Sequence, residues 1–278
     1  MTIREALRLA AARLEQAGVP DADVDAAYLL ASALKEDTLA MRINGHRELA
    51  APQRAAFDAL CDRRAAREPL QYILGETEFM GLTFHVEPGV LIPRADTETL
   101  VEKALAWMKP GARVLDIGTG SGAIAVSLAK LGRPAQVTAV DVSDRALEIA
   151  RRNAERNGAA VEFVKSDCFS ALKGRKYDMI VSNPPYISED EMRGLMPEVT
   201  REPELALFGG ADGLDFYRRI SREAPEYLNE GGCLLFEIGW LQKDAVSALV
   251  KAHIGEPFAL RDYGQNWRVV GAKKEGAC

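Results

Sequence analysis

Cysteine and histidine are scarce in this chain of 278 residues, and they are not grouped as a metal site or a disulfide framework requires. The four cysteines are scattered without a CxxC pair, and the three histidines lie near none of them. The pattern therefore argues against zinc and against structural disulfides. We expect Cys61 and Cys233 to be small apolar residues of a core, and we expect no metal in the functional site.

The chain also lacks a long apolar run. No stretch approaches the roughly 18 residues that a membrane-spanning helix needs. The first residues carry an acid at Glu5 and show no apolar core of a signal peptide. We therefore expect a cytoplasmic protein that makes no contact with a membrane.

An excess of positive charge is absent as well. The formal net charge is -6, whereas nucleic-acid-binding proteins usually carry a basic face, so direct nucleic-acid binding is not expected. The densest basic cluster consists of Arg63, Arg64 and Arg67. It falls at the end of an expected helix, where arginine favours the helix dipole, and we expect its side chains to be solvated.

Short helices are predicted for residues 1–75. Thr2 and Glu5 have the spacing of a capping box, and Pro52 suits the first turn of a later helix. Pro69 is expected to end the helical run. Because each helix carries few large apolar residues, this segment is more plausible as a substrate-recognition domain than as a catalytic one.

Residues 76–96 are expected to form a β-hairpin linker, because apolar residues surround Gly81 and a Pro-Gly pair follows. From residue 97 to 278 strand and helix patterns alternate, which predicts an α/β domain with a doubly wound, mostly parallel sheet. Strands are expected at 113–117, 136–141, 161–165, 177–182, 232–238, 257–262 and 267–271.

A glycine-rich turn follows the first of these strands, with the sequence Gly118-Thr119-Gly120-Ser121-Gly122. About 20 residues further on, the next strand ends at Asp141, whose carboxylate can accept both hydroxyls of a ribose. These features predict an adenosine cofactor, although the spacing alone leaves NAD open. The GxGxG pattern does not match the pyrophosphate seat of GxGxxG. Asp116 precedes the glycines, where it can attract the sulfonium or amino group, so S-adenosylmethionine is favoured.

Asp167 and Cys168 follow the third expected strand. The Asp167 carboxylate can accept the adenine amino group, and Cys168 can lie against the adenine ring. An acid in such a loop is more often a helix cap. The place of this loop beside the other two favours the cofactor role.

The strand at 177–182 ends in Asn183-Pro184-Pro185-Tyr186. Open α/β sheets bind ligands at the carboxyl ends of their strands, so this loop should face the glycines and Asp141. The Asn183 side-chain oxygen and the Pro184 carbonyl can each accept one N–H of a planar NH₂ group. Both acceptors orient the nitrogen and stabilise its developing charge. Pro184 and Pro185 stiffen the loop, and Tyr186 offers a flat face for the substrate.

Three functions fit these residues: methylation of a protein amide, methylation of an amino group on a DNA or RNA base, and cofactor binding without catalysis. A nucleic-acid enzyme should carry a basic cleft and a target-recognition insert, and the acidic balance and the absence of a long insert count against it. A non-catalytic protein should show damage to the glycine or Asn183 loop, and neither loop is damaged.

The sequence resembles the HemK/PrmC family, the glutamine N5-methyltransferases of peptide-chain release factors, over nearly the whole chain. The segment Leu91-Ile92-Pro93-Arg94 followed by Asp96-Thr97-Glu98 is the most specific match. Further matches are Pro69 to Gly75, Asp116 to Gly122, Asn183 to Tyr186, Glu202-Pro203, Phe236 to Gly239 and Arg261 to Gly264.

The resemblance implies a seven-stranded, Rossmann-like methyltransferase domain that uses S-adenosylmethionine, behind a small all-α domain that grips a class 1 release factor. It implies methylation of the glutamine in a Gly-Gly-Gln motif, which modulates translation termination. The positions that match cofactor contacts are Gly118 to Gly122, Asp141, Cys168 and Asn183. Two positions depart from the family: Cys168 replaces a frequent aromatic residue, and Ala95 replaces a usual proline.

The expected linker contains two further residues, His85 and Arg94, whose surroundings the sequence suggests. His85 alternates with apolar residues on an expected strand, which suggests an exposed strand histidine. Arg94 has two interpretations, a contact with the release factor or the cofactor carboxylate, or an ion pair with Asp96 or Glu98.

Overall fold

The structure is a computed structural model that describes residues 1–134 and 136–274. The chain divides into two compact units. Unit 1 comprises Met1–Glu76 and Met196–Arg201, and unit 2 comprises Thr77–Leu195 and the described residues from Glu202 onward. The chain therefore passes from one unit to the other three times. The hairpin segment that we expected to be a separate linker belongs, from Thr77 on, to the unit that contains the sheet.

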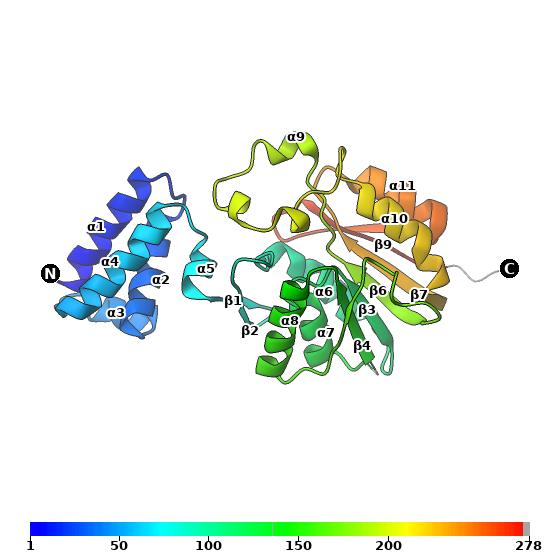
Figure 1. Cartoon of the computed structure of the whole chain (residues 1–278), viewed down its shortest axis with the longest axis horizontal. Coiled ribbons are helices and arrows are strands. Elements are labelled where there is room, and N and C mark those ends of the chain that lie inside the picture. Colours follow the sequence, from blue (N-terminus) through cyan, green and yellow to red (C-terminus); the bar gives the residue numbers. More distant parts are fainter. Residues whose placement is uncertain (135, 275–278) are drawn as a thin grey trace. The chain divides into compact units, whose positions relative to one another are not determined.

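The N-terminal part of unit 1 is helical (Figure 1, blue to cyan). Its helices are α1 (Ile3–Gln16), α2 (Ala22–Leu34), α3 (Thr38–Ile43), α4 (Ala51–Ala65) and α5 (Leu70–Leu74). The predicted capping box is formed, because Thr2 N–H donates to the Glu5 carboxylate at 2.8 Å and Glu5 N–H donates to the Thr2 hydroxyl at 3.3 Å. Pro69 does not end the helical run: α5 starts directly after it, since a first turn leaves its N–H groups unpaired anyway.

Unit 1 has its own apolar core. Leu14, Leu29, Leu30 and Phe57 are almost completely buried, and Cys61 packs among them as the sequence suggested. Fully burying one such side chain contributes about 1.5–3 kcal/mol. Helices α1 to α5 all contribute side chains to this core and therefore hold one another in place.

Arg64 differs from the expectation of a solvated side chain. It is buried, and its Nε donates to Asp25 at 2.6 Å while its Nη1 donates to Glu198 at 2.8 Å. Arg67 reaches the same Glu198 carboxylate through two hydrogen bonds of 2.6 Å. A buried guanidinium is tolerated only when carboxylates compensate its lost hydration. Of the basic cluster, Arg63 keeps an exposed side chain.

Unit 2 is built on a seven-stranded sheet with the order β5-β4-β3-β6-β7-β9-β8. All pairs are parallel except those of β9, which is antiparallel to both neighbours. The doubly wound, mostly parallel sheet that the sequence predicted is thus confirmed. The strands are β3 (Arg113–Ile117), β4 (Gln136–Asp141), β5 (Glu162–Lys165), β6 (Tyr177–Ser182), β7 (Leu228–Glu237), β8 (Phe258–Arg261) and β9 (Trp267–Lys273).

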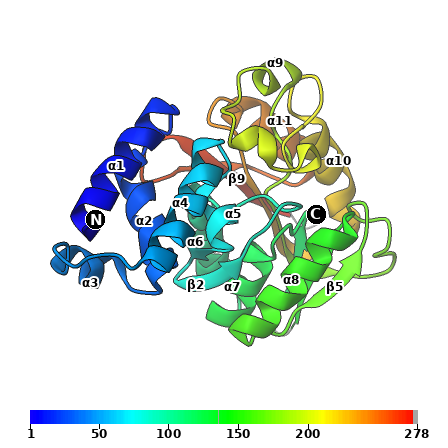
Figure 2. The same cartoon turned by 60° about the vertical axis from the view of Figure 1, so that its left-hand side comes forward.

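Helices cover both faces of the sheet (Figures 1 and 2). On one face lie α6 (Ala95–Trp107), α7 (Ala123–Leu131) and α8 (Asp144–Asn157), and on the other lie α10 (Asp215–Glu223) and α11 (Lys243–His253). The loop after β6 contains the short helix α9 (Glu189–Met192) and the 3₁₀ turns Val199–Arg201 and Glu204–Ala206. A further 3₁₀ turn, Ala224–Glu226, follows α10.

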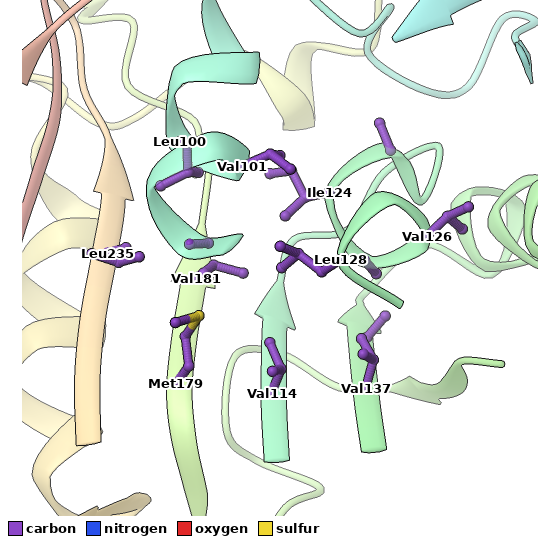
Figure 3. Packing of buried hydrophobic residues seen from close by; sticks show 14 of the residues in the cluster. Leu100, Val101, Val114, Ile124, Val126, Leu128, Val137, Met179, Val181 and Leu235 are labelled. Atoms are coloured by element: carbon purple, nitrogen blue, oxygen red, sulfur yellow. The ribbon is translucent and has the colours of Figure 1, made fainter. Parts of the chain in front are cut away.

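Side chains that alternate along the strands fill the space beneath these helices. Figure 3 shows this for one face, where strand residues point toward α6 and α7. The strand residues are Val114, Val137, Met179 and Leu235, and the helix residues are Leu100, Val101, Ile124, Val126 and Leu128. Close packing on both faces makes the sheet stiff. The loops at its carboxyl ends are therefore held on a rigid platform.

A two-stranded hairpin precedes α6. It consists of β1 (Glu76–Phe79) and β2 (Leu82–His85), and it is fastened to α8. Asn153 accepts a hydrogen bond from His85 N–H at 2.7 Å, and Asn157 donates to the Thr83 carbonyl at 3.0 Å. The His85 side chain is partly exposed on β2. No helix among the described residues is long and apolar enough to cross a membrane.

Candidate active site

A hollow of about 830 Å³ opens at the carboxyl ends of β3, β4, β5 and β6. It lies at the topological switch point of the sheet: β4 and β5 lie on one side of β3, and the chain then crosses to place β6 on the other side. The predicted site residues that line it are Gly118, Gly120, Asp141, Asp167, Cys168, Asn183, Pro184 and Pro185. The predicted residues outside the lining are Asp116, Thr119, Ser121, Gly122 and Tyr186.

The three glycines of the turn after β3 have different surroundings. All three adopt positive φ angles, of 73° at Gly118, 54° at Gly120 and 83° at Gly122, which glycine alone adopts without strain. A Cβ added at Gly118 or Gly120 would meet nothing within 4 Å, whereas one at Gly122 would lie 3.0 Å from Ala150. The first two glycines therefore leave space open beside the hollow, and the third lets α7 pack against α8.

Asp141 ends β4 at the rim of the hollow. One carboxylate oxygen accepts from Gly120 N–H and the other from Ser143 N–H, both at 2.9 Å. Burial raises the pKa of Asp141, and these hydrogen bonds act in the opposite direction. Each carboxylate oxygen can accept a further hydrogen bond. The side chain is thus oriented by the backbone while it keeps acceptors for a ligand.

Asp116 is completely buried beneath the turn. Its Oδ2 accepts from the Thr119 hydroxyl at 2.7 Å, whereas no group of residues 1–134 and 136–274 lies in hydrogen-bond geometry with its Oδ1. Burial raises the pKa of Asp116 to about 7, against the effect of Thr119. An unsatisfied buried acceptor is costly, and a cationic or N–H-bearing ligand nearby would relieve that cost. The contact of Asp116 with the sulfonium or amino group stays a prediction.

The loop after β5 places Asp167 and Cys168 on the hollow. The Asp167 carboxylate is largely exposed and forms an ion pair of 2.6 Å with Arg219 on α10. Cys168 has a φ of 48°, and burial raises the pKa of its thiol to about 11, so it is not a thiolate nucleophile at neutral pH. Asp167 therefore has a structural partner, and its contact with adenine stays a prediction.

The backbone of the Asn183–Tyr186 loop is held by close neighbours. The Tyr186 carbonyl accepts from Gln242 Nε2 at 2.9 Å. A Cβ added at Gly213, whose φ is 75°, would lie 2.3 Å from the same carbonyl, and one at Gly209 would lie 2.6 Å from the Pro185 carbonyl. Only glycine permits such close approach. The loop is consequently preorganised by its surroundings as well as by its two prolines.

The Asn183 side chain has a defined orientation. Its Nδ2 donates to the Thr97 hydroxyl of α6 at 3.4 Å, so its Oδ1 remains available to an incoming N–H. The Thr97 side chain is buried. Burial also raises the pKa of Tyr186 well above its usual value, so the phenol stays protonated and is not a general base.

Arg94 does not form the ion pair with Asp96 or Glu98 that was one of its two interpretations, and its contact with a release factor or the cofactor carboxylate stays a prediction. Its guanidinium pairs with Glu202, whose second oxygen accepts from Ile92 N–H at 2.9 Å. Asp96 and Glu98 have other partners, Arg268 and the Met80 N–H. The Leu91–Arg94 segment is thus fastened to the loop after β6.

Gly213 and Gln242, near the Asn183 loop, were not singled out from the sequence, and Thr97 and Glu237 were noted only as members of matching segments without a role in the site. The segment 209–213 carries three glycines, which signals close backbone approach. Glu237 is an acid at the end of a strongly apolar strand, which signals a buried carboxyl. Thr97 and Gln242 give no local signal, because their partners are distant in the sequence.

The residues present fit S-adenosylmethionine. The glycines leave room for a ligand, Asp141 offers acceptors for the ribose, and Asp116 has one unsatisfied oxygen nearby. Among residues 1–134 and 136–274, no group of three or more His, Cys, Asp or Glu side chains could hold a metal ion.

The fold and this site define a Rossmann-like methyltransferase. Residues 82–201 match the family described as methyltransferase small domain, and residues 5–75 match the PrmC N-terminal domain. A methyltransferase from Pyrococcus furiosus has the same fold, with a TM-score of 0.57 and 24% identity over 71% of this chain and 91% of that chain.

Two release factor glutamine methyltransferases are similar to this chain over nearly its full length. The release factor glutamine methyltransferase of Geobacter sulfurreducens is 46% identical over 98% of this chain and 96% of the relative. That of Cereibacter sphaeroides is 44% identical over all of both chains. The chain therefore belongs to the release factor glutamine methyltransferase family. It is an S-adenosylmethionine-dependent enzyme, as the sequence predicted.

Proposed function

We propose that this enzyme methylates the side-chain amide nitrogen (N5) of the glutamine in the Gly-Gly-Gln motif of class 1 release factors and so modulates translation termination. The main support is the shared name of relatives that align along nearly the whole chain. The preorganised acceptors at Asn183 and Pro184 suit a planar amide. We also propose that the enzyme works in the cytoplasm with a release factor as its protein partner.

Asn183 and Pro184 would orient the glutamine. The Asn183 Oδ1 accepts one N–H of the amide and the Pro184 carbonyl accepts the other, while the Tyr186 ring packs against the amide plane. When bound in the hollow lined by Gly118, Asp141 and Asn183, S-adenosylmethionine would supply an electrophilic methyl group with S-adenosylhomocysteine as the leaving group. The nitrogen lone pair forms the new C–N bond, and the nitrogen then releases a proton to solvent. The acceptors stabilise the positive charge on nitrogen before that proton leaves.

The cofactor would occupy the hollow beside this loop. In this proposal Asp141 accepts the ribose hydroxyls, Asp167 accepts the adenine amino group, and Cys168 lies against the ring. Asp116 attracts the sulfonium or amino group, and Thr119 and Ser121 contact the cofactor from the turn whose glycines face it. Asn183 touches both the cofactor and the substrate.

A second hollow, of about 510 Å³, begins at Tyr186. Trp240 and Leu241 line it and are 57% and 71% exposed. Large apolar side chains exposed beside a reaction site are typical of a protein-binding surface. The residues of the release factor on either side of the target glutamine would bind to this surface. The helical residues 1–75 would provide a second contact with the release factor.

The test is mass spectrometry of a purified class 1 release factor after incubation with the enzyme and S-adenosylmethionine. We expect one added methyl group on the Gly-Gly-Gln glutamine. Asn183→Ala should lower kcat by about 10²–10³-fold, the usual loss when one preorganised hydrogen-bonding group is removed. Circular dichroism and chemical unfolding control for folding of the variant, because Asn183 lines the cofactor hollow itself. Unmodified release factor in the presence of a cofactor-saturated wild-type enzyme would refute the proposal.

A further inference from the structure

A polar cluster lies directly behind the Asn183 loop, in the interior of unit 2. It joins Thr97 of α6, Glu237 at the end of β7 and the Tyr186 side chain. Thr97 is 4% exposed and Glu237 is 2% exposed. Acidic side chains are almost never buried to this degree without a role that repays the loss of hydration.

The hydrogen bonds in this cluster have a direction. Asn183 Nδ2 is a donor, so the Thr97 hydroxyl oxygen accepts at 3.4 Å and must turn its own hydrogen elsewhere. The Glu237 carboxylate is the group that interacts with the Thr97 side chain. An ionised carboxylate only accepts hydrogen bonds. The order of donation is therefore Asn183 to Thr97 to Glu237, and it leaves the Asn183 Oδ1 facing away from the cluster.

We propose that Glu237 is a positioning residue, which acts through Thr97 to keep the Asn183 side-chain oxygen, rather than its NH₂ group, directed at the reacting nitrogen. This inference rests on the proposed role of Asn183. With the amide reversed, Asn183 would present a donor to the substrate amide and repel it.

Other charged groups also face Glu237. Arg268 of β9 and Asp96 of α6 act on it, together with the Tyr186 hydroxyl. Arg268 is itself paired with Asp96 at 2.9 Å and with Asp262 at 3.1 Å. One guanidinium therefore faces three carboxyl groups and neutralises Glu237 only in part. The Oε2 of Glu237 has no hydrogen-bond partner in the described part of the chain.

A pH dependence follows. Burial raises the pKa of Glu237 to about 7, against the effects of Thr97 and Arg268. Below this pH the carboxyl group is protonated and can donate to Thr97. The Thr97 hydroxyl is then free to donate to the Asn183 Oδ1, and the amide can reverse. The rate should therefore fall as the pH drops through about 7.

The experiment compares Glu237→Gln, Thr97→Val and Thr97→Ser with the wild type. A glutamine can donate through its NH₂ group, so Glu237→Gln should lower kcat roughly 10²-fold, as should Thr97→Val. Thr97→Ser keeps the hydroxyl and should retain kcat within about threefold. The affinity for S-adenosylmethionine should be unchanged in all three variants. Glu162→Gln, on the edge strand β5, serves as the control carboxyl variant and should match the wild type.

A second readout does not need catalysis. The side-chain NH₂ resonances of Asn183, assigned by their loss in Asn183→Ala, should titrate near pH 7 in the wild type and not in Glu237→Gln. Titration without methylation of a release factor would refute the proposed substrate and keep the positioning role. Wild-type kcat in Glu237→Gln, or a resonance that does not titrate, would overturn the positioning role. If Glu237→Gln fails to fold, wild-type kcat in Thr97→Val would overturn the positioning role.

Discussion

Each unit contains one glutamate that is surrounded by other charged side chains, and the pKa values of these two glutamates are shifted in opposite directions. In unit 1 two cations meet two anions: Arg64, Arg67, Asp25 and Glu198. In unit 2 one cation meets three anions: Arg268, Asp96, Asp262 and Glu237. The first set is balanced and the second is not. The comparison separates a charge cluster that stabilises a fold from one that holds a carboxyl group ready to titrate.

The pKa values express this difference. Burial acts to raise the pKa of Glu198, but the hydrogen bonds from Arg67 and Arg64 outweigh it and lower the pKa to about 2. Burial raises the pKa of Glu237 to about 7, and Thr97 and Arg268 compensate only in part. Ionised Glu198 therefore favours folding, whereas ionised Glu237 opposes it. An ionised group that opposes folding in this way is typical of a functional position.

The largest effect is expected from breaking the balanced cluster. Arg64→Ala leaves Asp25 buried without its partner and removes one bond to Glu198, which should destabilise unit 1 by about 3–5 kcal/mol. Chemical unfolding of the full chain measures this loss. Arg63→Ala is the matched control, because this exposed arginine should contribute no more than about 1 kcal/mol. Equal losses in both variants would remove the distinction between buried and exposed pairs.

Removing the charge of the glutamate in the unbalanced cluster of unit 2 should raise the free energy of unfolding, whereas breaking the cluster of unit 1 lowers it. Glu237→Gln should lower kcat while raising the free energy of unfolding at pH 8, by at most about 3 kcal/mol from the pKa shift. The folded state holds its extra proton between the unfolded value of 4.5 and about 7. The stabilisation of the variant over the wild type should thus grow across this interval and level off above it. A variant that is less stable as well as inactive would indicate a structural role alone.

The contribution of the balanced cluster in unit 1 to stability should be lost at acidic pH. Because the pKa of Glu198 is lowered, its contribution is complete above pH 4.5 and is lost as the pH falls through about 2. The wild type should lose about 2 kcal/mol more than Glu198→Gln over this interval. Equilibrium unfolding at several acidic pH values measures the difference. Parallel curves for the two proteins would contradict the lowered pKa.

The smallest effect is expected at the exposed pair of Asp167 and Arg219. Arg219→Ala should change stability by no more than about 1 kcal/mol, since water screens the pair. Asp167→Ala should weaken S-adenosylmethionine binding by about 1 kcal/mol, one neutral hydrogen bond, if the carboxylate contacts adenine. Calorimetry of both variants separates the cofactor role from the ion pair. Identical affinities would leave Asp167 as a loop residue.

The sequence was sufficient for the sheet and for the loops at its carboxyl ends. Strands such as 113–117 and 136–141 were predicted with the bounds that the structure has, because apolar runs and glycine turns are local signals. The hollow accordingly collects Gly118, Asp141 and Asn183, as their positions after parallel strands required.

Long-range contacts could not be predicted in the same way. Arg64 was expected to be solvated because its partner Glu198 lies 134 positions away and no local pattern announces the pair. Near neighbours were one of two interpretations for Arg94, whereas its ion-pair partner is Glu202, 108 positions away. Thr97 and Asn183 are 86 residues apart. Charge pairs depend on which loops meet, and the periodicity of a sequence does not encode that.

Unit 1 includes six residues, Met196–Arg201, from the middle of the sequence. Exchange of gene segments between relatives would ordinarily move an N-terminal domain as one continuous block. Here a block that ends at Glu76 would carry Arg64 and Arg67 to a new host without the carboxylate of Glu198. Recombination should therefore favour exchanges that keep both segments together, and a chimaera that exchanges unit 1 should transplant Met196–Arg201 with the helices.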